Sequence, residues 1–514
     1  MESCLTYNLR PNFFGVPLTP AYKPLRCMSR ALFSIGFVQV LIILVNMVRA
    51  KVLSILLGPA GFGVVSTIDQ IVVSVIQLGG LAVPAVALKL LSYAHSDSHE
   101  KFQEAYSSFL SGILGLSLIA TAIMLALIGL KPDLFGADIV PYIEYLNLAL
   151  LSVPTLMLAL FFVNTLAAAQ KSEHSIYLHF IVTLSLTVAG CLGVYFGGIM
   201  GLYIATIPTG IIASIGTLVF VRRTLKVKVF SQATGLVKAI RRKPEIASIA
   251  LVLYITLSAY SIMMLVVRFF VFSSLGEEQV GFLQALLSIA LALGAISGPM
   301  NALFFMPLVN RALPLDAKLK AAHDFQRTIT LLMAAITLPF ILFPKLALFL
   351  LFSSEFIVIS QLVYLFILWQ CLFQMLNVYQ QLLVGLDDTL FATIGSTSGY
   401  LIAIILCALL IPDFGLTGTA IALIIGLLVT GLMTSYRLKT KFHSAIPADL
   451  WVRTLLCLAG ITITGLTFNQ IEEWSLGGIT ARAGFACAYI SALWFFLNAE
   501  QKQFVLNLRH KLPF

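Results

Sequence analysis

Short sequence patterns recur in this chain about 217 residues apart, and both copies lie inside strongly apolar stretches. Residues 57–63 (LGPAGFG) have their counterpart in residues 275–281 (LGEEQVG), 218 positions later. Residues 198–205 (GIMGLYIA) recur as residues 415–422 (GLTGTAIA), 217 positions later. Two offsets that agree within one residue rarely arise by chance between apolar stretches. A tandem duplication inside a membrane predicts two similar halves, an arrangement typical of secondary transporters, whose substrate site lies between the halves.

Composition places the chain in a membrane. Hydrophobic residues make up 60% and charged residues 11% of its 514 positions, whereas soluble domains carry about 25% charged residues. No water-soluble core could absorb that much apolar surface, so lipid must be the solvent. The net charge of +10 lies in short links between apolar runs, which argues against nucleic acid as a partner. The seven cysteines form no CxxC or Cys/His cluster, and we expect most of them to be small packing residues.

Fourteen apolar runs are long enough to cross about 30 Å of hydrocarbon. The sequence therefore predicts an all-α integral membrane protein with two homologous six-helix bundles and two further C-terminal helices. The expected spans are residues 31–56, 64–87, 108–130, 141–165, 176–197, 201–221, 246–272, 281–305, 328–352, 357–383, 390–411, 415–436, 452–469 and 479–497.

Basic residues mark alternate links between these spans. With the N-terminus inside, most of the 32 Lys and Arg residues fall on the cytoplasmic side, and a miscounted span would spoil this alternation. The pattern predicts a multi-pass membrane protein with both termini in the cytoplasm. Residues 1–30 contain basic residues and prolines without an apolar run and cleavage site, so we expect no signal peptide. Translation could instead begin at Met28, which leaves open whether residues 1–27 are made.

The repeat and the links divide the chain into five parts. The longest link is strongly basic and is expected to lie along the anionic inner leaflet. The parts are a cytoplasmic extension (1–30), an N-terminal six-helix lobe (31–221), a basic cytoplasmic linker (222–245), a C-terminal six-helix lobe (246–436), and two extra transmembrane helices with a cytoplasmic tail (437–514).

Four charged residues stand out inside the expected spans. Arg49 and Asp69 lie about ten residues before and after the turn near Gly58, and Arg268 holds the place of Arg49 in the second copy. An ionised side chain at this depth is costly unless it faces protein or water. We interpret both arginines and Lys51 as a cationic cavity for a phosphate-bearing or otherwise anionic substrate, with Asp69 as counter-ion or proton carrier. The alternative is a structural Arg49–Asp69 salt bridge and a Lys51 side chain that reaches the membrane surface.

The tenth expected span carries a stripe of amide side chains. Gln370, Gln374, Asn377 and Gln381 are spaced by 4, 3 and 4 residues, which places them on one face of a helix. Amides donate and accept hydrogen bonds without charge, so the stripe is interpreted as cavity lining that suits sugar hydroxyls. The alternative is hydrogen bonding between helices, which is common in membranes.

Motifs for catalysis or cofactor binding are missing from the sequence. It contains no Walker A motif, no HExxH, no GxSxG and no metal-type spacing of His and Cys. We therefore expect neither an enzyme nor a cofactor, and ATP-driven transport by this chain alone is not expected. Ion or proton gradients remain possible sources of energy.

The pattern at the first turn resembles a known family. An arginine-bearing first helix, residues 56–63 (LLGPAGFG) and a second helix that reaches Leu78-Gly79-Gly80 resemble the bacterial polysaccharide-repeat (O-antigen, Wzx-type) flippases of the MOP exporter superfamily. The resemblance implies that undecaprenyl-pyrophosphate-linked oligosaccharides are moved from the cytoplasmic to the outer face of the bacterial inner (plasma) membrane. The movement would occur by alternating access, for O-antigen, capsule or exopolysaccharide synthesis. It implies cationic cavity residues for the pyrophosphate, here Arg49 and Arg268. A polysaccharide polymerase and a chain-length regulator are the partners that it suggests, besides membrane lipids.

Two other classes of protein compete with this interpretation. A cation-coupled antiporter of the multidrug-extrusion branch would use membrane-embedded carboxylates, for which Asp69 is the clear candidate, but twelve helices suffice for that branch. A membrane polysaccharide polymerase would need a sizeable loop or an acidic pair facing a cleft, and the links on the outer side are short. The glycan, the coupling ion and the oligomeric state do not follow from the sequence.

Overall fold

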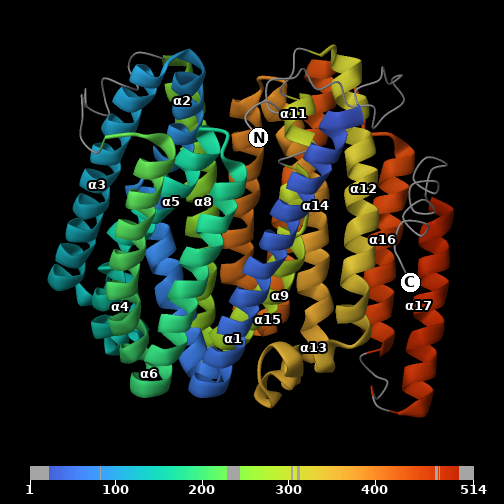
Figure 1. Cartoon of the computed structure of the whole chain (residues 1–514). Helices are drawn as coiled ribbons and strands as arrows, with labels where there is room; N and C mark the ends of the chain where they lie inside the picture. Colours follow the sequence, from blue (N-terminus) through green and yellow to red (C-terminus); the bar gives the residue numbers. More distant parts are fainter. Residues whose placement is uncertain are drawn as a thin grey trace.

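The described part of the chain is built of helices. The computed structural model describes residues 22–81, 83–228, 244–301, 305–309, 313–468, 473 and 475–496, and no strand occurs within them. Figure 1 shows the long helices running side by side. We call the lower end in Figure 1, where α1 and α6 bend back, the hairpin end of the bundle.

The α-helices are α1 (Tyr22–Gly79), α2 (Val83–Asp97), α3 (His99–Leu130), α4 (Ile143–Leu150), α5 (Val153–Ala168), α6 (Ser172–Leu225), α8 (Pro244–Leu275), α9 (Glu277–Ala295), α10 (Ser297–Met300), α11 (Met306–Val309), α12 (Leu315–Leu342), α13 (Pro344–Leu351), α14 (Val363–Gly385), α15 (Thr389–Phe442), α16 (Ala448–Phe468) and α17 (Leu476–Phe496). The 3-10 helices are η2 (Pro132–Phe135), η3 (Ala137–Tyr142) and η5 (Ser354–Leu362).

Three of the long helices are each two antiparallel arms joined at a glycine. Non-helical backbone interrupts α1 at Gly58, α6 at Gly198 and α15 at Gly415, where φ is 65°, 57° and 56°. This left-handed region is sterically costly for a residue with a Cβ, so glycine permits the turn. The arms fold back on each other, as in α6, where the backbones of Gly193 and Gly201 meet on either side of the turn.

The number of spans agrees with the prediction from hydropathy. Nine helices of the described residues are long and apolar enough to cross a membrane, or up to ten if the pair 138–150 and α5, bent by 43°, is one span. Three of these helices contain two arms, which gives thirteen spans, and α17 lies at the place of the fourteenth expected span. The predicted fold class, an all-α membrane protein with two six-helix bundles and two C-terminal helices, is confirmed.

The duplication is also visible in the backbone. Positive φ angles recur in four pairs that are 217 or 218 residues apart, at matching turns of the two halves. The pairs are Gly58 with Gly276, Gln170 with Asp387, Gly198 with Gly415, and Lys226 with His443. Two of these turns have a different non-glycine residue in each copy, so the conformation is maintained although the residue type is not.

The two halves meet through α1, α8 and α9. The backbone of Gly63 in α1 lies against the backbone of Glu277 and Gly281 in α9, and a Cβ on Gly281 would collide with the carbonyl of Pro59. Gly63 and Gly281 occupy equivalent positions of the two repeats. The halves therefore cross at matched glycines beside the bend of α1, which permits backbone contact without side chains between the helices.

Several boundaries differ from the expected spans, and the expected span 328–352 is divided between α12 and α13. The first helix begins at Tyr22 rather than near residue 31, and the expected span at 141–165 is broken at Leu151–Ser152 between α4 and α5. Residues 1–21 and most of the expected linker (229–243) lie outside the described residues, so the question of translation from Met28 and the predicted domain boundaries stay predictions.

Candidate functional site

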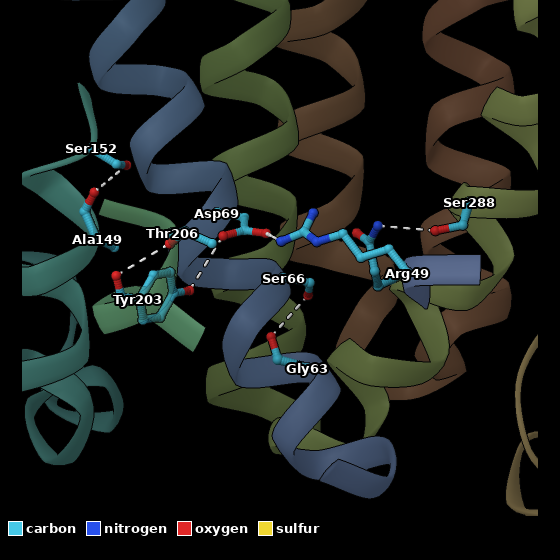
Figure 2. Close-up of polar contacts among 10 residues, drawn as sticks. Arg49, Gly63, Ser66, Asp69, Ala149, Ser152, Tyr203, Thr206 and Ser288 are labelled. Carbon is cyan, nitrogen blue, oxygen red and sulfur yellow. Dashed lines mark hydrogen bonds and ion pairs between the residues drawn. The ribbon is translucent and has the colours of Figure 1, made fainter. Parts of the chain in front are cut away.

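A charged cluster lies between the two arms of α1 and the second arm of α6. Nη2 of Arg49 donates to Oδ2 of Asp69 at 2.9 Å, and the hydroxyl of Tyr203 donates to Oδ1 of the same carboxylate at 3.3 Å. Figure 2 shows Asp69 between the two donors. The turn at Gly58 explains the pairing, since residues about ten positions on either side of it face each other at the same depth. About a third of each charged side chain is exposed, at 34% for Arg49 and 35% for Asp69.

Arg268 of α8 is buried and is bonded to neutral oxygens. Its side chain donates to the carbonyl oxygen of Met264 at 3.0 Å and to Oε1 of Gln284 in α9 at 2.6 Å. Gln284 is held in turn by Ser288, which accepts from its Nε2 at 3.1 Å (Figure 2). Arg268 is only 5% exposed, its Nε has no partner, and it forms no ion pair with an acidic residue of the described chain.

The carboxylate of Asp69 acts on both arginines, although only Arg49 is paired with it. Asp69 interacts electrostatically with Arg268 as well as with Arg49, so the cluster combines two cations with one anion. A buried cation without an ion pair is costly, because neutral oxygens replace only part of the hydration it gives up. An anion bound beside Arg268 would reduce this cost, and its guanidinium has donors to spare. The cluster therefore favours an anionic ligand.

Lys51 lies elsewhere. It donates to the carbonyl oxygens of Phe349, at 2.5 Å, and of Phe352, and its Nζ lies over the ring of Phe349, 5.3 Å from the centroid. Phe349 lies in the last turn of α13, and Phe352 directly follows the helix. Among the expected cationic residues, the structure pairs Arg49 with Asp69, leaves Arg268 with an electrostatic interaction with that carboxylate and no ion pair, and places Lys51 at a helix end.

The amide stripe divides into two parts. Gln374 accepts from Ser297 Oγ at 2.7 Å and donates to the carbonyl of Gly294 at 3.3 Å, and buried Gln370 packs against the same glycine. These two amides join α14 to α9 and α10. Asn377 and Gln381, further along α14, are partly exposed. The contacts fit the alternative of helix–helix bonding for the first two, and a substrate role for the stripe stays a prediction.

Several residues of the site were not predicted from the sequence. Tyr203 gave one usable signal, since it lies inside the repeated motif 198–205, whose second copy has Ala420 in its place. Gln284 is a single polar residue in an apolar span, which is more typical of a packing contact. Close to Arg268, Tyr260 forms an aromatic cluster with Phe373 and Tyr400, with centroids 6.4 and 5.7 Å away, beside a small apolar cavity.

Metal binding has no support in the described residues. No group of three or more His, Cys, Asp or Glu side chains that could hold an ion occurs among them. The hydrogen-bond donors to Asp69 are a guanidinium and a phenol, an arrangement suited to anion exchange or proton transfer.

Comparisons with known proteins find similarity in structure. No protein-family model and no curated protein matches the chain. Among solved structures, "Lipid II flippase MurJ, inward closed conformation" is similar with a TM-score of 0.66 and 17% identity, over 91% of this chain and 99% of that one. An inward-facing multidrug resistance MATE family transporter of the MOP superfamily gives 0.58 and 14% over 84% and 99%. A MOP superfamily transporter from Pyrococcus furiosus gives 0.57 and 15% over 84% and 96%. The chain thus has the fold of the MOP superfamily of transporters.

Proposed function

We propose that the chain is a flippase that moves a lipid-linked, phosphate-bearing oligosaccharide across the bacterial inner membrane by alternating access. The observation that carries the proposal is Arg268, which is buried at 5% exposure, bonded to neutral oxygens and left with an unpartnered Nε. A guanidinium in this state suits the bidentate geometry of a phosphate group. The undecaprenyl-pyrophosphate-linked repeat units of O-antigen, capsule or exopolysaccharide are the substrate class that the sequence resemblance suggests.

The extent of the structural similarity supports a flippase. Residues 1–436 form about 85% of the 514 residues, so a match over 91% of the chain extends into the two C-terminal helices. The matches to the MATE family transporter and to the Pyrococcus furiosus transporter cover 84%, which the twelve-helix part alone could supply. The similarity to the lipid II flippase thus reaches beyond the twelve-helix part of this chain.

Charge distribution supports an orientation. Arg222 and Arg223 at the end of α6, and Arg437 at the end of α15, lie at the ends of arms that lead away from the hairpin end. The positive-inside rule therefore favours a cytoplasmic location for the end opposite the hairpins. In this orientation the glycine crossing of α1 and α9 closes the outer side, and the anion site would be reached from the cytoplasm.

The site suggests how a substrate anion would be held and released. A phosphate beside Arg268 would take its spare donors, and it would compete with Asp69 for Arg49, because both are anions and Arg49 is a third exposed. Arg49 belongs to the first half and Arg268 to the second. A movement of the halves would separate the two guanidinium groups and weaken their joint grip on the anion.

One observation favours a second candidate, a cation-coupled antiporter. Asp69 is a carboxylate inside the membrane, and it accepts hydrogen bonds from Arg49 and Tyr203. Carboxylates in membranes commonly mark proton or ion pathways. In an antiporter, protonation of Asp69 would release Arg49 and couple transport to a gradient.

Deletion and complementation would test the proposal. The deletion strain is expected to accumulate single lipid-linked repeat units on the cytoplasmic side and to lose surface polysaccharide. Wild-type protein should restore both, Arg268→Met should fail, and Arg222→Met, which removes an exposed arginine, should act like the wild type at equal expression. Unpolymerised units on the outer face would identify a polymerase. Normal polysaccharide together with drug sensitivity would favour the antiporter.

A further inference from the structure

The short helix α13 is bonded at both of its ends to other parts of the chain. It has eight residues, Pro344–Leu351, and lies at the hairpin end between α12 and η5 (Figure 1). The carboxylate of Glu473, which precedes α17, accepts from the backbone N–H of Lys345 at 2.8 Å and of Leu346 at 3.2 Å. Glu473 is 2% exposed. A carboxylate at a helix N-terminus satisfies donors that the helix leaves free and is favoured by the helix dipole.

The C-terminal pair makes a second bond to the same region through Arg482 of α17. This side chain is fully buried, donates to the carbonyl of Leu342 at 2.7 Å and to that of Phe468 at 3.0 Å, and lies over the rings of Phe343 and Phe468. Leu342 is the last residue of α12, and Phe468 is the last residue of α16. Arg482 thus fastens the C-terminal pair to the point where α12 leads into α13.

The other end of α13 is bonded to the first half of the chain. Lys51 of α1 donates to the carbonyls of Phe349 and Phe352, the acceptors that the last turn of α13 leaves free. A cation at a helix C-terminus is favoured by the dipole, as the carboxylate is at the other end. The two ends of α13 therefore bond side chains from parts of the sequence more than 400 positions apart.

Other contacts between the halves gather around this end of α13. Phe62 of α1 packs against Phe352 and Phe356, each with centroids 6.0 Å away, and Phe282 of α9 packs against Phe356 at 5.5 Å. The glycine crossing of α1 and α9 is one residue from Phe62 and Phe282. If the halves separate at the hairpin end, the bond from Lys51 to α13 breaks with them.

We propose that α13 is a strut through which the two C-terminal helices hold the halves together at the hairpin end. Glu473 and Arg482 fix the strut to the C-terminal pair, and Lys51 fixes the first half to the strut. The pair thereby biases the conformational equilibrium toward the state closed at this end. The inference rests on the proposed alternation between two states and is independent of the substrate.

Distance measurements between two spin labels by pulsed electron paramagnetic resonance, with the protein in lipid nanodiscs, would test the strut. Spin labels at Phe196 and Phe414, exposed residues next to the bends of α6 and α15, report the separation of the halves at positions within one residue of each other in the repeat. Lys51→Met and Glu473→Gln each remove charge-assisted hydrogen bonds, so each should raise the ratio of long to short distances by about tenfold. Glu278→Gln, which removes an exposed carboxylate at the same end, is the control and should match the wild type.

The double variant distinguishes a strut from two unrelated contacts. If both residues act through α13, Glu473→Gln should add little in the Lys51→Met background, whereas independent contacts would give the product of the two effects. An unchanged distance distribution in either single variant, or a multiplicative double variant, would overturn the proposal. Failure of the complementation experiment with intact strut behaviour would reject the flippase function alone, since no substrate is present in this measurement.

Discussion

The sharpest prediction is that replacing Arg268 by methionine removes ligand binding and leaves folding almost untouched. Arg268 makes two hydrogen bonds to neutral oxygens, at 3.0 and 2.6 Å, and losing them costs about 1–3 kcal/mol together. Removal of a buried cation without an ion pair offsets this by about 1–4 kcal/mol. The net change in the free energy of unfolding should therefore lie between a loss of about 2 and a gain of about 3 kcal/mol, a shift of only a few degrees in Tm.

Arg49→Met is the matched comparison. This variant leaves Asp69 with the single 3.3 Å hydrogen bond from Tyr203. An orphaned carboxylate that is about a third exposed should cost about 1–3 kcal/mol, since partial exposure reduces the penalty of a fully buried charge. Arg49→Met should thus lower Tm clearly, whereas Arg268→Met should not.

Two assays separate stability from binding. Thermal unfolding in one detergent, without ligand, gives the stability order, and calorimetric titration with undecaprenyl pyrophosphate gives the affinity. Loss of two charge-assisted bonds from Arg268 should weaken binding by about 100-fold. If Arg268→Met lowers Tm as much as Arg49→Met and binds the lipid like the wild type, Arg268 is a structural residue and the anion-site argument is wrong.

Three further outcomes are expected. Gly281→Val would drive the valine side chain into the carbonyl of Pro59, and this overpacking should cost about 1–3 kcal/mol. The glycine crossing should then open, which would be measured as faster hydrogen exchange of the backbone in that part of α9. Unchanged exchange would contradict the close approach. The guanidinium of Arg437 holds the pKa of Asp388 below its ordinary value. This carboxylate therefore stabilises the fold above about pH 4 and less below it. Asp388→Asn should lose less Tm between pH 6 and pH 3 than the wild type, and equal losses would refute the coupling. If Asp69 is a counter-ion, the Asp69→Asn variant should still export polysaccharide, and this export should still depend on Arg268. If Asp69 is the coupling group, Asp69→Asn should abolish proton-driven uptake in proteoliposomes.

Local sequence determined what could be predicted. Hydropathy and the glycine turns set the spans, and the position of Gly58 placed Arg49 and Asp69 at equal depth, where they form an ion pair at 2.9 Å. Arg268 was identified because it repeats the place of Arg49. These inferences need only helix geometry and one turn.

Packing between distant segments decided the rest. The carbonyls that bind Lys51 lie about 300 positions further along the chain, and no spacing rule connects them. The 4, 3, 4 spacing of the amides defined one face of α14, but which part of that face packs against Gly294 depends on how closely α9 approaches. A helical period specifies a face and leaves its neighbour undefined.

The burial of Arg268 has a consequence for biogenesis. A lone arginine costs up to about 2.5–3.5 kcal/mol when its span enters the bilayer, and Gln284, the partner of Arg268, belongs to the next span. Gly276 is the one residue between α8 and α9, so the two helices can leave the insertion machinery as a single hairpin with the hydrogen bond already formed. Lengthening this turn would separate the insertion of α8 from that of α9. The yield of inserted protein should then fall.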